Sequence, residues 1–318
     1  MNTSAKAILD GNRRALAKAI TLIESHLPEH IEQGQQLLDQ LLPHTGNSVR
    51  IGISGIPGVG KSTFIEAFGL YLISLGKRVA VLAVDPSSPL AGGSILGDKT
   101  RMEYLAREEK AFIRPSPTSG SLGGVANKTR ESILLVEAAG YDVVLVETVG
   151  VGQSEYEVAG MVDFFTVLML PNAGDELQGI KKGILELADS LLVNKSDGES
   201  VQLAQMTKRH YENAFHLLRQ NSFWTPQVMP ISALENNNIE AVWGMVIDYV
   251  SQAKEQGSFT TKRAQQNRNW LDKLIHELLE QILMQNDSAQ ALWPRLELDV
   301  VNGKMTPFAA AKAIIKTL

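Results

Sequence analysis

Residues 55 to 63 have the types and the spacing of a phosphate-binding loop. In order they are Gly55, Ile56, Pro57, Gly58, Val59, Gly60, Lys61, Ser62 and Thr63. Glycines at these positions let backbone amides turn toward a phosphate, and the N-terminus of a following helix adds partial positive charge. Lys61 is expected to reach the β- and γ-phosphates, and the Ser62 hydroxyl to bind Mg²⁺. The motif predicts a site for a nucleoside triphosphate rather than a simple glycine turn.

A second motif indicates which base is bound. Asn194, Lys195 and Asp197 form an N-K-x-D pattern directly after an apolar segment. The Asp197 carboxylate can accept from both N1–H and the exocyclic amine of guanine, whereas adenine would leave a buried carboxylate without its donors. We expect Lys195 to lie along the base plane and Asn194 to tie this loop to the phosphate loop. The pattern predicts GTP as the nucleotide.

A short segment further along the chain supports the same base. It follows the apolar run 227–231 and consists of Ser232, Ala233 and Leu234. A backbone amide of this segment is expected to contact the guanine oxygen. The tripeptide alone predicts nothing. It supports a guanine site only because it follows the phosphate loop and the N-K-x-D pattern in the order typical of GTPases.

Carboxylates after apolar segments are candidates for Mg²⁺ and for catalysis. Glu147 ends an apolar run and occupies the place where many GTPases carry the Asp of D-x-x-G, so Gly150 is expected to sense the γ-phosphate. Asp85 and Asp98 are expected to hold waters of Mg²⁺ or to orient the attacking water. Two simpler interpretations remain open: Glu147 as the cap of a strand, and Asp98 as the N-cap of a helix.

The elements that position these motifs form an α/β pattern. Short apolar strands are predicted at 49–54, 78–84, 111–114, 142–147, 163–170, 189–193 and 227–231. Helical patterns between most of them imply crossovers and a doubly wound, mostly parallel sheet. We predict an N-terminal helical extension (1–45), a phosphate-loop GTPase domain (46–256) and a C-terminal helical arm (257–318). The terminal helices either cover the sheet of their own domain or form a dimerisation arm.

The amino-acid composition excludes several classes of binding partner and metal site. The chain has 318 residues, a net charge of −5 and no cysteine. We therefore expect no nucleic-acid footprint and no polybasic membrane patch, and thiolate metal sites and disulfides are excluded. The sequence also shows no membrane-length apolar run and no signal peptide, which predicts a cytoplasmic protein.

Taken together, six segments resemble the MeaB/ArgK-type GTPases, the family that includes the methylmalonic aciduria type A protein. They read G-I-P-G-V-G-K-S-T, A-V-D-P-S-S-P, G-G-S-I-L-G-D-K-T-R-M, V-E-T-V-G-V-G-Q-S-E, L-Q-G-I-K-K-G and N-K-S-D. The resemblance runs from about residue 10 to about residue 255, and the C-terminal 60 residues share only a general helical likeness.

The resemblance implies a slow GTPase that acts as a chaperone. Such proteins gate cofactor loading of an adenosylcobalamin-dependent methylmalonyl-CoA mutase or a close relative, and protect or reactivate that enzyme. By this likeness, the residues matching phosphate, Mg²⁺ and catalytic positions are Lys61, Ser62, Asp85, Asp98 and Glu147. Residues 170–182 match a mobile third switch, in which Lys181 matches a residue implicated in GTPase activation. Members are usually homodimers through their C-terminal helices.

Two rival functions are open. One is a kinase of a basic amino-acid transport system, although N-K-x-D fits a guanine switch better than an ATP-dependent kinase. The other is a metallochaperone GTPase for nickel or zinc, but Cys is absent and the pairs His26/His30 and His210/His216 are not spaced for shared ligation. Adenosylcobalamin is expected only in the partner enzyme, because the chain lacks D-x-H-x-x-G.

Overall fold

The computed structural model describes residues 5–84, 102–115, 122–148, 154–171, 182–218 and 223–318. Within these stretches, seven strands form one sheet in which every neighbouring pair is parallel. The strands are β1 (Val49–Gly55), β2 (Val79–Val84), β3 (Ala111–Arg114), β4 (Val143–Thr148), β5 (Phe164–Met169), β6 (Ser190–Val193) and β7 (Gln227–Pro230). Their order is β3-β2-β4-β1-β5-β6-β7. The predicted doubly wound α/β fold is confirmed, and each predicted strand end lies within one residue of the observed end.

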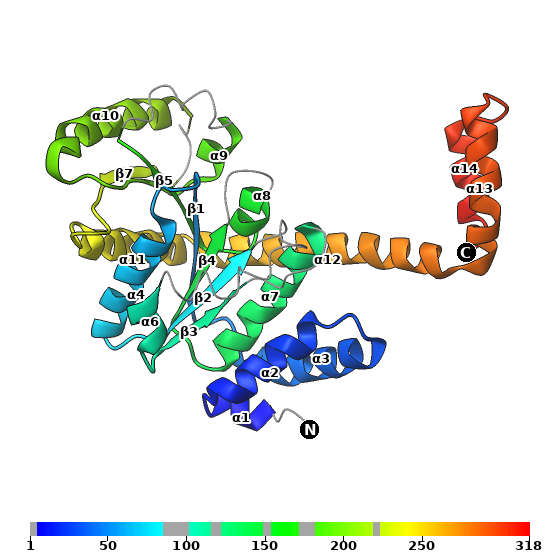
Figure 1. The fold of residues 1–318 in the computed structure, drawn as a ribbon, viewed down its shortest axis with the longest axis horizontal. Coiled ribbons are helices and arrows are strands. Elements are labelled where there is room, and N and C mark those ends of the chain that lie inside the picture. Colours follow the sequence, from blue (N-terminus) through cyan, green and yellow to red (C-terminus); the bar gives the residue numbers. More distant parts are fainter. Residues whose placement is uncertain (1–4, 85–101, 116–121, 149–153, 172–181, 219–222) are drawn as a thin grey trace. The chain divides into compact units, whose positions relative to one another are not determined.

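Helices cover both faces of this sheet (Figure 1). Over both parts of the chain, the helices in the described stretches are α1 (Ala5–Leu9), α2 (Arg13–Glu24), α3 (Pro28–Leu41), α4 (Lys61–Ser74), α6 (Glu103–Arg107), α7 (Leu122–Ala138), α8 (Ser154–Ala159), α9 (Lys182–Leu187), α10 (Val201–Leu218), α11 (Ile239–Glu255), α12 (Ser258–Gln285), α13 (Asp287–Val301) and α14 (Pro307–Ile315), with 3-10 turns η1 (Leu42–His44) and η3 (Gly198–Ser200). The sheet is covered by helices that precede α13. Because side chains alternate along a strand, successive residues of β2 enter two different cores. Val79 and Val81 join α4, α6 and α11, whereas Ala80 and Leu82 join α2, α3, α7, α8, α9 and α10.

The N-terminal helices belong to the second of these cores. Leu16, Ile20 and Ile23 of α2 are buried there, and α2 and α3 both pack on α7. Asn12 caps α2 by accepting from two backbone amides of its first turn, and Pro28 begins α3, where a missing N–H costs nothing.

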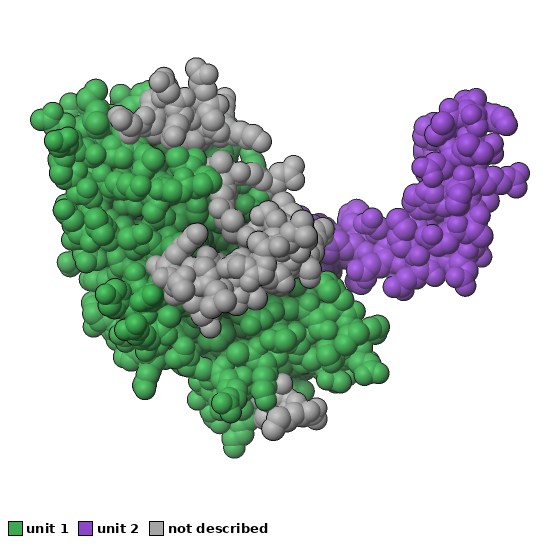
Figure 2. All heavy atoms as spheres, in the orientation of Figure 1, with its two compact units in different colours: residues 1–262 green, residues 263–318 purple. Residues whose placement is uncertain are grey.

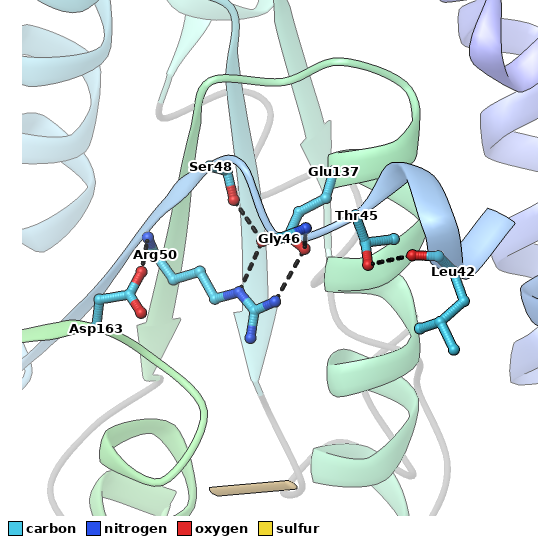
Figure 3. A network of polar contacts seen from close by, with 7 residues as sticks. All are labelled: Leu42, Thr45, Gly46, Ser48, Arg50, Glu137 and Asp163. Atoms are coloured by element: carbon cyan, nitrogen blue, oxygen red, sulfur yellow. Dashed lines mark hydrogen bonds and ion pairs between the residues drawn. The ribbon is translucent and has the colours of Figure 1, made fainter. Parts of the chain in front are cut away.

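A buried ionic network joins the end of this helical region to the sheet (Figure 3). Glu137 of α7 accepts from Gly46 N (2.8 Å), Ser48 Oγ (2.5 Å), and Arg50 Nε (2.7 Å) and Nη2 (2.9 Å). The amide of Arg50 donates to the Asp163 carboxylate at 2.8 Å. Burial raises the pKa of Glu137, but the hydrogen bonds and charge of Arg50, together with the bonds from Ser48 and Gly46, outweigh burial and leave the pKa below its ordinary value. The network fixes the starts of β1 and β5.

The chain divides into two compact units, residues 1–262 and 263–318 (Figure 2). The second unit contains most of α12 together with α13 and α14, around a small core of Ala289, Leu296, Ala310 and Ile314. The domain boundaries predicted from sequence, at residues 45 and 256, remain predictions. In the described part of the chain no helix combines the length and apolarity that crossing a membrane requires.

Lys262, in the second turn of α12, is the last residue of the first unit, and its side chain bonds to residues of that unit. Its ammonium donates to the Asp163 carbonyl (2.5 Å) and to the Tyr249 hydroxyl (3.3 Å), and pairs with the Asp189 carboxylate (3.4 Å). Desolvation lowers the pKa of Lys262, and Asp189, Tyr249 and Asp163 more than compensate, so the net pKa is raised. The beginning of α12 is thus anchored at the amino ends of β5 and β6.

Candidate nucleotide-binding site

The glycine-rich segment links the end of β1 to the start of α4. Gly60 immediately precedes α4 with φ of +96°, a left-handed conformation that favours glycine. Gly55 also has positive φ (+152°), and a Cβ there would lie 2.7 Å from the Leu168 carbonyl oxygen of the adjacent β5. Side chains at these positions would therefore disturb the loop. The segment is a strand–loop–helix unit of the kind that binds phosphate at a helix N-terminus.

Lys61, the first residue of α4, is folded back over this loop. Its Nζ donates to the carbonyl oxygens of Gly55 (2.7 Å) and Ile56 (3.3 Å), and only 8% of the residue is exposed. Burial lowers the pKa of Lys61, and the negative charges of Glu147 and Glu155 partly oppose that shift. The structure thus places the ammonium at the phosphate loop, held by the loop's own carbonyls.

Asn194, directly after β6, connects the phosphate loop with the segment after β7. Its Nδ2 donates to Val59 O at 2.8 Å, and its Oδ1 accepts from Ala233 N at 3.1 Å. A Cβ on Gly60 would lie 2.6 Å from the same Nδ2, so glycine leaves room for this amide. One buried side chain therefore brings together the three segments singled out in the sequence.

The remaining residues of the N-K-x-D pattern surround this link. Lys195 has φ of +58°, and its Nζ donates to Gly58 O at 2.9 Å. The Asp197 carboxylate accepts from Ser232 Oγ at 2.5 Å, which joins the base loop to the next one. Leu234 is 79% exposed. The Ser232 hydroxyl thus supports Asp197, and the Ala233 amide is already bonded to Asn194.

The structure describes only some of the candidate catalytic and metal residues. Ser62 lies in the first turn of α4, and Glu147 lies near the end of β4, paired in register with Ile53 of β1 and 8% exposed. Four further candidates lie outside the described residues: Asp85, Asp98, Gly150 and Lys181. Among the residues that are described, no three His, Asp or Glu side chains gather into a metal-binding group.

Glu155, in the first turn of α8, belongs to the surroundings of Lys61 and had no assigned role in the sequence. It is fully buried, and its charge acts on the Lys61 ammonium. Glu155 is the last residue of the family-like segment V-E-T-V-G-V-G-Q-S-E, and that resemblance is the one sequence signal that separates it from Glu157 two residues later. Only the fold shows that Glu155 faces the interior while Glu157 acts on Arg130 of α7.

A scan against protein-family models matches residues 16–288 to MeaB, described as methylmalonyl Co-A mutase-associated GTPase MeaB. The chain belongs to the MeaB family. It is therefore a GTPase, a result that agrees with the phosphate loop and the guanine-type loop joined by Asn194.

Relatives of the MeaB-family chain carry names of two kinds. GTPase ArgK of Escherichia coli is 49% identical over 305 residues, covering 96% of this chain and 92% of that protein. The methylmalonic aciduria type A homolog of Mus musculus, described as mitochondrial, is 45% identical over 320 residues, covering 97% of this chain and 77% of that protein. A solved structure of a protein named LAO/AO transport system kinase is similar with a TM-score of 0.79 and 41% identity, covering 98% and 95% of the two chains.

Proposed function

We propose that this GTPase is a chaperone of an adenosylcobalamin-dependent methylmalonyl-CoA mutase-type enzyme, gating its cofactor loading and protecting or reactivating it. The observation that supports the nucleotide part is the Asn194 bridge, because this one side chain joins the phosphate loop to the base loop. The family description and the name of the mouse relative support the choice of client. Adenosylcobalamin is proposed to reside in the client.

We further propose that Mg²⁺ accompanies GTP. The described donors suit Mg²⁺, because a hydroxyl and a carboxylate are hard oxygen ligands: Ser62 lies in the first turn of α4 and Glu147 next to the end of β4. Asp85 and Asp98 are proposed to complete the site. When bound, the ion neutralises charge on the phosphates. Lys61 holds the phosphates, Gly150 senses the terminal one, and Asp197 accepts from guanine.

A homodimer through the C-terminal helices is also proposed. In the second unit, large apolar side chains of α12 are about half exposed, namely Leu271, Ile275, Leu278, Leu279 and Ile282. Their spacing of three and four residues makes a stripe, which a second copy would bury. Sedimentation of the full chain should give a dimer, and the double variant Leu278→Glu/Leu279→Glu a folded monomer. A monomeric wild type would refute this part.

The test of the chaperone function is GTP turnover with and without the client. The purified protein is assayed alone and with an adenosylcobalamin-dependent methylmalonyl-CoA mutase, with ATP as the control nucleotide. We expect slow GTP hydrolysis that the mutase stimulates, and no ATP hydrolysis. Lys181→Ala should keep the basal rate and lose the stimulation, because Lys181 matches a residue implicated in GTPase activation in the family; a fall in the basal rate would count against that role.

Other outcomes would redirect the proposal. GTP hydrolysis unaffected by the mutase would contradict the client and leave the GTPase. ATP consumption with phosphate transfer to a second molecule would instead favour a kinase, the activity that the name of the structurally similar protein gives.

A further inference from the structure

Two pairs of buried hydroxyls link neighbouring strands in the described part of the sheet. Thr148 Oγ1 donates to Ser54 Oγ at 2.9 Å between β4 and β1, and Ser190 Oγ donates to Thr166 Oγ1 at 2.7 Å between β6 and β5. All four residues are at most 1% exposed. Thr148 ends β4 at the carboxyl edge of the sheet, whereas Ser190 begins β6 at the amino edge. The first pair therefore lies at the edge where the phosphate loop begins, and the second does not.

The first pair stands next to two elements of the candidate site. Ser54 immediately precedes Gly55, the first glycine of the phosphate loop, and Thr148 immediately follows Glu147. Because side chains alternate along a strand, Thr148 and Glu147 project from opposite faces of the sheet. Glu147 is the register partner of Ile53, which packs in the same core as α4. One bond on the face covered by α7 and α8 thus joins the strand end that leads into the phosphate loop to the strand end that carries Glu147 (Figure 1).

The hydrogen bond also sets how closely the two strand ends approach each other on that face. The hydroxyl oxygens of Thr148 and Ser54 are 2.9 Å apart. A methyl group in place of the Thr148 hydroxyl would need about 3.3–3.6 Å from the Ser54 oxygen. The surroundings cannot absorb the difference easily, because Val146 and Val167 beside the pair are at most 2% exposed and a close-packed interior transmits strain. Valine at position 148 would therefore displace the end of β4, and Glu147 with it, by roughly half an ångström.

A shift of that size matters at a metal ligand. Mg²⁺ requires near-ideal octahedral geometry with its ligands at about 2.0–2.1 Å, and misplacing a reacting group by about 1 Å can lower a rate about 100-fold. We propose that Thr148 is a positioning residue for GTP hydrolysis, which acts through Ser54 to hold Glu147 at its distance from the phosphate loop. The inference rests on the proposed role of Glu147 as a ligand of Mg²⁺, and it adds a residue on the opposite face of the sheet.

The test compares Thr148→Val with Thr166→Val. Each replaces one hydroxyl of a buried pair by a methyl group and takes the hydrogen bond from the serine partner, Ser54 or Ser190. Single-turnover GTP hydrolysis is measured at saturating GTP across a Mg²⁺ titration, and GDP affinity is measured in EDTA with a fluorescent analogue. We expect Thr148→Val to hydrolyse GTP roughly tenfold more slowly and to need more Mg²⁺, with its GDP affinity in EDTA within about twofold of wild type. Thr166→Val should keep the wild-type rate and Mg²⁺ requirement.

Rescue by serine separates positioning from general damage to the fold. Thr148→Ser keeps the hydroxyl and loses only a methyl group, so it should restore most of the rate. If Thr148→Val does not fold, Ser54→Ala removes the acceptor on the other strand and should slow hydrolysis in the same Mg²⁺-dependent way. Three results would overturn the proposal: wild-type hydrolysis by a folded Thr148→Val, an equal loss in Thr166→Val, or a Thr148→Ser variant as slow as the valine variant.

A parallel assay of Glu147→Gln keeps this inference distinct from the Mg²⁺ role on which it rests. Glu147→Gln should slow hydrolysis at least as much as Thr148→Val, because it removes the charged group that Thr148→Val only shifts. Unchanged hydrolysis by Glu147→Gln would refute the Mg²⁺ role, and the positioning with it. Slow hydrolysis by Glu147→Gln beside normal hydrolysis by Thr148→Val would refute the positioning alone.

Discussion

Replacing Glu137 by Gln should strongly destabilise the first unit while leaving nucleotide binding intact. Glu137 accepts four hydrogen bonds, two of them from Arg50, and its side chain is 1% exposed. A glutamine has one accepting oxygen, so its NH₂ must face two donors, and the Arg50 guanidinium (13% exposed) loses its counter-charge. Removing one partner of a buried pair costs about 3–5 kcal/mol.

Thermal and urea unfolding at pH 7.5 would measure this loss. For a unit of this size we expect the melting temperature to fall by roughly 10 °C. Glu131→Gln is the matched control: it lies on the same helix and bonds to Gln35 and Lys128. Its loss should be about 1 kcal/mol or less. GDP affinity should be unchanged in both variants, because Glu137 holds the start of β1 and the phosphate loop follows its end.

The pH dependence supplies a second check on Glu137. A carboxylate whose folded pKa is depressed contributes stability above its unfolded pKa and loses it as the pH falls through the folded value. Since the pKa of Glu137 lies below its ordinary range, the gap between wild type and Glu137→Gln should be constant at neutral pH and shrink below about pH 4. Two results would refute the reasoning. One is a stability loss for Glu137→Gln no larger than that for Glu131→Gln; the other is a stability difference from wild type that stays the same below about pH 4.

Three further substitutions test other contacts. Gly60→Ala places a methyl group 2.6 Å from Asn194 Nδ2 at a left-handed position, and should weaken GDP binding at least tenfold in a titration with a fluorescent analogue, with the fold retained by circular dichroism. Asp197→Asn should remove most of the preference for GTP over ATP in competition binding, and an unchanged ratio would contradict the assigned base loop. Lys262→Met should cost roughly 1 kcal/mol in urea unfolding. Because the pKa of Lys262 is raised, that cost should persist to about pH 10 and vanish at higher pH; a flat profile would contradict the pairing with Asp189.

The sheet was predictable from sequence because its strands are buried on both faces. Runs such as Val79–Val84 and Val143–Thr148 are continuously apolar or nearly so, and helical periodicity separates them, which is typical of parallel α/β proteins. The Asn194 link was predicted as well, because its motif requires a tie to the phosphate loop. Local patterns of this kind specify an element and its ends.

Contacts between distant residues were not predictable. Arg50 and Glu137 are 87 positions apart, and neither stands in a recognisable motif. Glu155 closes a family-like segment and Glu157 lies just beyond it, but the sequence does not show that one faces the interior and the other lies near Arg130, because that depends on how α8 packs. The end of the first compact unit falls inside α12, where helical periodicity continues without a break. Such features depend on which faces meet in three dimensions.

The packing of α2 and α3 on α7 sets an order of events during synthesis. Leu16, Ile20 and Ile23 leave the ribosome well before α7, the helix that helps to bury them, which ends at Ala138. At roughly 5–20 residues per second, these apolar side chains wait on the order of ten seconds for their partner. During that interval the nascent chain exposes the apolar faces of α2 and α3, which can associate with other exposed apolar surfaces. A chain shortened by its first 45 residues would have the opposite defect, since the face of α7 that packs against α2 and α3 would stay uncovered.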